Sequence, residues 1–149
     1  MQARGIVEVS SRLWQLLELS TELESLMNVA LWMVQGLLAV LLLMAGVAKL
    51  TQPREKMLAR AAWVEDFTDG PLKTIGGLEV LAAIGLILPG VTGIAPVLVP
   101  IAASGIILLL IGAVVVHTRR SEISNIAANL VIIAMAAFVA WERLGDYAL

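Results

Sequence analysis

The C-terminal apolar run from Ile123 to Trp141 places the tightest limit on the fold. It contains 19 residues without a charge, and it lies between Arg119-Arg120 and Glu142-Arg143. At about 1.5 Å per residue, a helix of this length nearly crosses a hydrocarbon core of about 30 Å. Asn125 and Asn129 lie one turn apart near its start and face the same way. Because amides inside a bilayer need hydrogen-bonding partners, we expect this helix to pack against other helices.

The composition excludes several classes of protein. The chain of 149 residues has the length of one domain, with 60% hydrophobic residues, 15% charged residues and a mean hydropathy of +0.93. A soluble helical bundle would need polar outer faces, whereas these runs are apolar all round. The net charge of −2 speaks against a nucleic-acid partner. Because the chain has no cysteine and only one histidine, we expect no haem, iron–sulfur or thiol cofactor and no metal site.

Three earlier runs are also long enough to cross a membrane, which predicts an all-α membrane protein with a bundle of four transmembrane helices. Asn28 is a candidate cap of the first helix. Prolines and glycines between Pro89 and Pro96 break an apolar stretch of 37 residues into a hairpin. The predicted spans are Asn28–Leu50, Leu72–Leu88, Pro96–Thr118 and Ile123–Trp141. Residues 28–143 then form the transmembrane domain, and residues 144–149 form a short tail.

Two amphipathic segments accompany the bundle. In residues 1–27, apolar side chains recur every three or four residues, which predicts an interfacial helix with Trp14 as an anchor. The acidic excess of this helix makes docking onto the protein itself an equal alternative. In the first connection, Arg54 to Phe67 predicts a short amphipathic helix. Its residues Trp63, Glu65, Asp66 and Phe67 are the candidate binding segment for a protein partner in the membrane.

The distribution of basic residues predicts the orientation. Six lysines and arginines lie in the first and third connections, against three on the opposite side. Basic loops stay in the cytoplasm, so both termini are expected outside the cell, in a multi-pass protein of the plasma membrane.

Four polar residues fall in the same half of the predicted membrane. Lys49 ends the first span, and Glu79 lies about 10 Å inside the second from the same side. His117 ends the third span at the third connection, and Asn129 lies about 10 Å inside the fourth span from that connection, one turn beyond Asn125. A carboxylate in hydrocarbon costs several kcal/mol unless it is paired, which indicates a shared polar or ligand-binding network. The alternatives are a lysine that reaches the headgroups, an ordinary interfacial histidine, asparagines that only join helices, and a purely structural salt bridge.

The same residues resemble a known family. The segments Ala45–Leu50 and Gly77–Pro89, followed by His117 and Asn129, are similar to the DoxX-like family of small four-helix membrane proteins. The resemblance covers about Leu31 to Arg143. It implies that the family's polar positions are Lys49, Glu79, His117 and Asn129 here. Some relatives are associated with quinol oxidase, sulfur or oxidative-stress systems, and animal relatives assist the assembly of membrane receptors.

Three functions remain open at this point. The first is an accessory or assembly subunit that is not an enzyme on its own and has no catalytic residues. The second is a redox-associated protein that binds a quinone, a lipid or another small amphiphile beside Glu79 and His117. The third is a proton-coupled exporter that uses Glu79, for which the adjacent lysine is a poor match.

Overall fold

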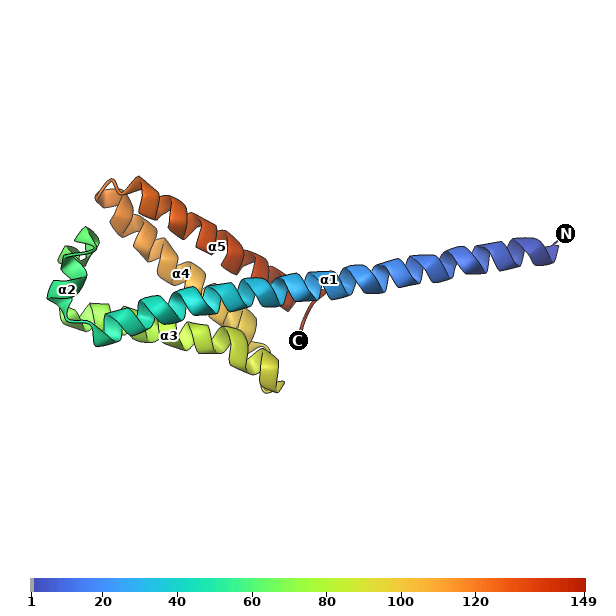
Figure 1. Ribbon diagram of the computed structural model, residues 1–149, viewed down its shortest axis with the longest axis horizontal. Coiled ribbons are helices and arrows are strands. Elements are labelled where there is room, and N and C mark those ends of the chain that lie inside the picture. The colour runs from blue at the N-terminus through green and yellow to red at the C-terminus, as the bar shows by residue number, and fades with distance from the viewer. Residues whose placement is uncertain (1) are drawn as a thin grey trace. The chain divides into compact units, whose positions relative to one another are not determined.

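The protein is entirely α-helical in the residues that the structure describes. The computed structural model describes the backbone of residues 2–149 and the side chains from Arg12 onward. No strand occurs in that part of the chain. The elements, shown in Figure 1, are α1 (Gln2–Thr51), α2 (Arg54–Leu58), the 3-10 helix η1 (Ala62–Asp66), α3 (Asp69–Thr92), α4 (Leu98–Arg119) and α5 (Ile123–Leu144).

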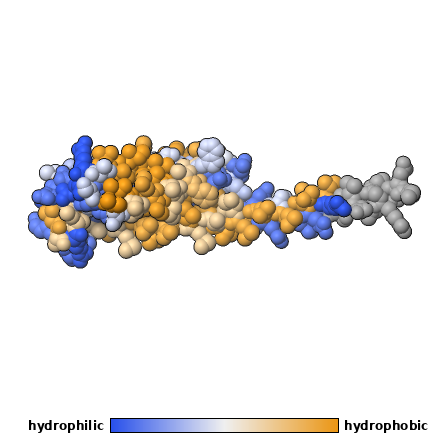
Figure 2. Space-filling model, turned by 90° about the horizontal axis from the view of Figure 1, so that it is seen from above, coloured by the Kyte–Doolittle hydropathy of each residue, from blue (hydrophilic) through white to orange (hydrophobic). Residues whose placement is uncertain are grey.

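Four of these helices are long and apolar enough to cross a membrane, namely α1 from Arg12, α3, α4 and α5. Their outer faces carry large apolar side chains: Leu81 is 64% exposed, Leu108 72% and Val131 61%. A soluble bundle would carry polar residues there, so this surface belongs against lipid. Figure 2 shows the apolar band, with hydrophilic residues gathered at one end of the bundle. The predicted four-helix membrane bundle is confirmed, and the protein is a multi-pass membrane protein.

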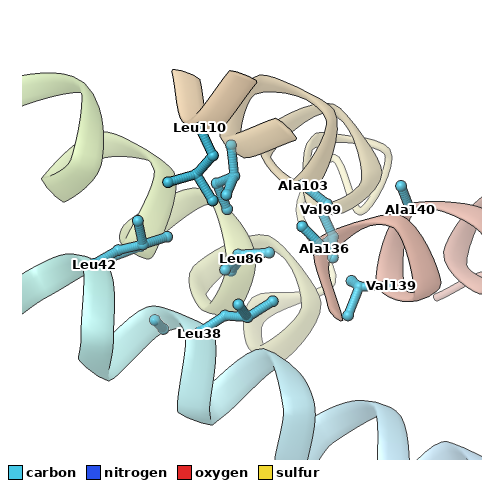
Figure 3. Packing of buried hydrophobic residues seen from close by; sticks show 12 residues of the cluster. Leu38, Leu42, Leu86, Val99, Ala103, Leu110, Ala136, Val139 and Ala140 are labelled. Carbon is cyan, nitrogen blue, oxygen red and sulfur yellow. The ribbon is translucent and has the colours of Figure 1, made fainter. Parts of the chain in front are cut away.

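The chain divides into two compact units, residues 1–33 and residues 34–149. The core of the second unit is formed by α1, α3, α4 and α5, with Leu38, Leu86, Ile106 and Val139 fully buried. Figure 3 shows how this core combines large side chains with small ones such as Ala103. Small residues let helix backbones approach closely, which replaces the hydrophobic driving force that is missing between helices in lipid.

The first unit contains the N-terminal part of α1, whose C-terminal part belongs to the second unit. Leu13, Trp14, Leu16 and other apolar side chains in this unit are exposed. The interfacial role of residues 1–27 stays a prediction, and Met1 and the side chains of residues 1–11 lie outside the described part. The expected helix cap at Asn28 is wrong, because α1 continues through this residue.

Two helix ends also differ from prediction. Pro89 lies inside α3, which continues to Thr92 and ends where Gly93 adopts φ 68°. Pro89 has no N–H to donate to the Gly85 carbonyl one turn earlier, and the Gln35 amide donates to the adjacent Leu86 carbonyl. In the first connection, an extended Ala61 separates α2 from η1, so the predicted single helix is two short ones.

Candidate functional site

A pair of glycines brings α1 against α3 at one end of the bundle. A Cβ atom added to Gly46 would lie 2.6 Å from the Gly76 carbonyl oxygen. One added to Gly76 would lie 2.8 Å from the Lys49 Cβ and 2.9 Å from the Gly46 carbonyl oxygen. Only glycine allows backbones this close, so these two residues set the distance between the helices one turn from their polar side chains.

Lys49 and Glu79 form an ion pair at this crossing. The Lys49 Nζ lies 2.8 Å from both carboxylate oxygens of Glu79, and it donates to each. The two side chains are 13% and 8% exposed, respectively. Both oxygens of the buried carboxylate therefore have a charged donor, which offsets the cost of removing the charges from water.

Trp63 of η1 joins this ion pair to His117. The Lys49 ammonium lies 5.7 Å from the centre of the indole ring, within the range of a cation–π interaction. The same ring system makes a T-shaped contact with His117, with centroids 6.1 Å apart and planes at 80°. Phe67 makes a similar edge contact with Trp63 at 6.0 Å. An aromatic residue of the first connection thus lies between the polar residues of α1 and α4.

His117 is paired with Glu122, a residue that the sequence analysis missed. The His117 Nδ1 lies 2.7 Å from one carboxylate oxygen of Glu122, and the amide of Asn125 donates to the same oxygen at 2.7 Å. The Arg120 Nε donates to the other oxygen at 3.1 Å. These bonds, first from Asn125, then from His117 and Arg120, lower the pKa of Glu122 despite its partial burial.

The local backbone explains why Glu122 can reach His117. Ser121 adopts φ 57°, which turns the chain sharply between α4 and α5. Glu122 follows at the N-cap position of α5. The one signal in the sequence was an acidic residue directly before a helix start, where negative charge is favoured.

Arg120 also fastens the first connection to the bundle. Its Nη1 donates to Asp66 at 2.9 Å, and its Nη2 lies 3.7 Å from Glu65. From the other side, Arg54 Nε donates to the Phe67 carbonyl at 2.8 Å. Figure 1 shows α2 at the end of the bundle where α4 turns into α5.

The polar network thus joins four of the five predicted site residues. Lys49 and Glu79 are linked to His117 through Trp63, and Asn125 is linked to His117 through Glu122. Asn129 is not among them: it is half-buried and hydrogen-bonds to none of the described residues. Glu79 is instead paired with Lys49, which donates to both of its carboxylate oxygens. A role of these residues in ligand binding stays a prediction.

The profile of the DoxX-like family matches residues 33–139, which is more than two thirds of the chain. The chain belongs to the DoxX-like family. This confirms the resemblance, and it places the whole network within the matched region. No curated protein and no solved structure is similar enough to match the chain.

This DoxX-like protein has a second buried polar group that the sequence analysis did not identify. Gln35 is fully buried; its amide donates to the Leu86 carbonyl at 2.8 Å and accepts a bond from the Arg143 Nε at 2.8 Å. Arg143 is 4% exposed and also donates to the Tyr147 carbonyl at 2.9 Å. In the sequence, Arg143 has the pattern of a charge that ends the last span, and the one signal of this buried group is a glutamine inside an apolar run.

An apolar groove of about 570 Å³ lies between α3 and α4 of this DoxX-like protein. Its wall includes Leu81, Gly85, Ala102, Gly105 and Leu108, and every lining residue is apolar. Neither Glu79 nor His117 lines it. The groove therefore suits a hydrocarbon chain rather than a polar head group.

Proposed function

We propose that this DoxX-like protein is an accessory or assembly subunit, which presents residues 63–67 to a protein partner at the membrane surface. The observation that carries the proposal is the way this segment is held. Trp63 is anchored against the bundle, while the side chains of Glu65 and Asp66 are 74% and 44% exposed. The segment is held against the bundle, and its two acidic side chains remain partly exposed beside Arg120, so little conformational entropy is lost when a partner binds.

The buried network supports this proposal through its internal pairing. Lys49 is paired with Glu79, and Glu122 is paired with His117, so the Glu79 carboxylate and the His117 imidazole each have a partner within the chain. Such pairs hold helices in register without a reaction. In this proposal their role is to hold the first connection in one position on the bundle.

The experiment is purification in mild detergent at native expression, followed by mass spectrometry of stoichiometric partners. Glu65→Lys should abolish recovery of the partner, because it reverses a charge on the presented segment. Glu55→Lys is the matched control, since Glu55 is an exposed acid of α2 in the same connection and outside the segment. Equal recovery with both variants, or no stoichiometric partner with the unaltered chain, would refute the proposal.

The proposed location is the plasma membrane, with the first and third connections in the cytoplasm. The excess of basic residues in these connections supports this orientation. Because the chain contains no cysteine, single cysteines can be introduced without background. A membrane-impermeant thiol reagent on intact cells should label Asp146→Cys and leave Lys56→Cys unlabelled. The reverse pattern would overturn the orientation.

A second candidate function is the binding of a quinone or another long-chain amphiphile, which the apolar groove favours. Gly105 lines the groove, and an added Cβ there would meet no atom within 4 Å. Gly105→Leu should therefore fill the groove and reduce the long-chain quinone that co-purifies. Gly112 is equally open but does not line the groove, so Gly112→Leu is the control. Unchanged quinone in Gly105→Leu would remove this candidate. No specific observation in the described residues favours the third hypothesis, a proton-coupled exporter.

A further inference from the structure

A second groove, of about 230 Å³, lies where α1 ends and α3 begins. Its wall combines the last turn of α1, the Gln52-Pro53 connection, Arg54 and Met57 of α2, and the first turn of α3. This volume is below the range of about 300–1,000 Å³ that is typical of drug-sized ligands, so it suits a small group.

The groove is lined by more positive than negative charge. Lys49, Arg54 and Lys73 contribute three positive charges, and Asp69 is its one carboxylate among the described residues. Glu79 forms an ion pair with Lys49 but does not itself line the groove. Even with this carboxylate counted, one positive charge remains in excess.

Two of the basic groups differ in how they are held. Arg54 is fixed, because its Nε donates to the Phe67 carbonyl and its Nη2 donates to the Glu65 carbonyl. Lys73 is exposed, and within the described residues it has neither a hydrogen bond nor an ion pair. The groove thus combines a preorganised guanidinium with a free ammonium group.

The position of the groove indicates what would bind there. Lys49 is the first charge after the apolar part of α1, and Lys73 lies at the start of the apolar part of α3. Both are therefore at the depth of the lipid headgroups, where basic pockets between helices bind anionic headgroups. We infer that this groove is a binding site for a phosphate group, as carried by an anionic phospholipid. The inference is independent of the proposed protein partner.

The test is native mass spectrometry of the full chain in detergent, titrated with phosphatidylglycerol or phosphatidylcholine. Phosphatidylglycerol should bind more tightly, and Lys73→Gln should weaken its binding about fivefold. Lys56→Gln is the matched control, because Lys56 is an exposed lysine of the same connection that does not line the groove. Asp69→Asn should strengthen the binding, a gain that a loss of folding cannot produce.

A competition with inorganic phosphate distinguishes the source of the phosphate group. In one outcome, phosphate displaces phosphatidylglycerol from the unaltered chain but not from Lys73→Gln. This result supports the site and identifies free phosphate as an occupant. Retention of the lipid in excess phosphate supports the site and identifies the lipid as its occupant. Equal binding of phosphatidylcholine, or equal weakening by Lys56→Gln and Lys73→Gln, would overturn the inference.

Discussion

Substitution of Gly76 by alanine tests the close crossing of α1 and α3 that positions the polar network. The added methyl group would lie 2.8 Å from the Lys49 Cβ and 2.9 Å from the Gly46 carbonyl oxygen, whereas ordinary contacts begin at 3.4 Å. The backbone atom cannot move aside as a flexible side chain would. The helices must therefore separate by about half an ångström, and overpacking of this kind costs about 1–3 kcal/mol.

The neighbouring glycine provides a matched control in the same helix. A Cβ on Gly77 would meet no atom within 4 Å, so Gly77→Ala creates no clash. Alanine also favours helix over glycine by up to about 1 kcal/mol. The helix gain applies to both variants, so Gly76→Ala should lower the free energy of unfolding by about 1–2 kcal/mol, the overpacking cost less this gain. Gly77→Ala should leave the free energy of unfolding unchanged or raise it by up to about 1 kcal/mol.

The assay is reversible unfolding in mixed micelles, with a denaturing detergent as the titrant and helical circular dichroism as the signal. The close crossing predicts different unfolding midpoints for these two variants, although both add the same methyl group to adjacent residues. If Gly76→Ala and Gly77→Ala unfold at the same detergent fraction, the close approach does not set the packing of this bundle.

Three further predictions use the same unfolding assay. Lys49→Met should lower the free energy of unfolding by about 3 kcal/mol, because it leaves the Glu79 carboxylate buried and unpaired. The double variant Lys49→Met with Glu79→Leu should recover most of that loss. Additive effects of the two substitutions would show that the pair does not interact. Gln35→Leu should cost about 2 kcal/mol by removing the acceptor of the buried Arg143 Nε, and a neutral effect would contradict the importance of that bond. Folding lowers the pKa of Glu122, so the ionised carboxylate stabilises the fold at neutral pH, and this stabilisation is lost as the pH falls through the lowered pKa. The difference in free energy of unfolding between the unaltered chain and Glu122→Gln should therefore shrink in acid. A difference that stays constant with pH would refute this prediction.

The sequence alone was sufficient for the architecture. The four spans follow from the length of uncharged runs compared with the thickness of a bilayer, which is a local property of the chain. The shared depth of Lys49 and Glu79 follows in the same way, because adjacent spans run in opposite directions. The segments around these two residues also carried the family resemblance.

The tertiary structure decided which polar groups meet. Arg143 is joined to Gln35 across 108 residues, and no local pattern distinguishes such a buried arginine from one that ends a span at the membrane surface. Trp63 lies between Lys49 and His117 because the first connection folds back onto the bundle, and Glu122 reaches His117 because Ser121 reverses the chain. Hydropathy predicts the depth of each residue, but the rotation of each helix and the path of each connection depend on packing between distant segments.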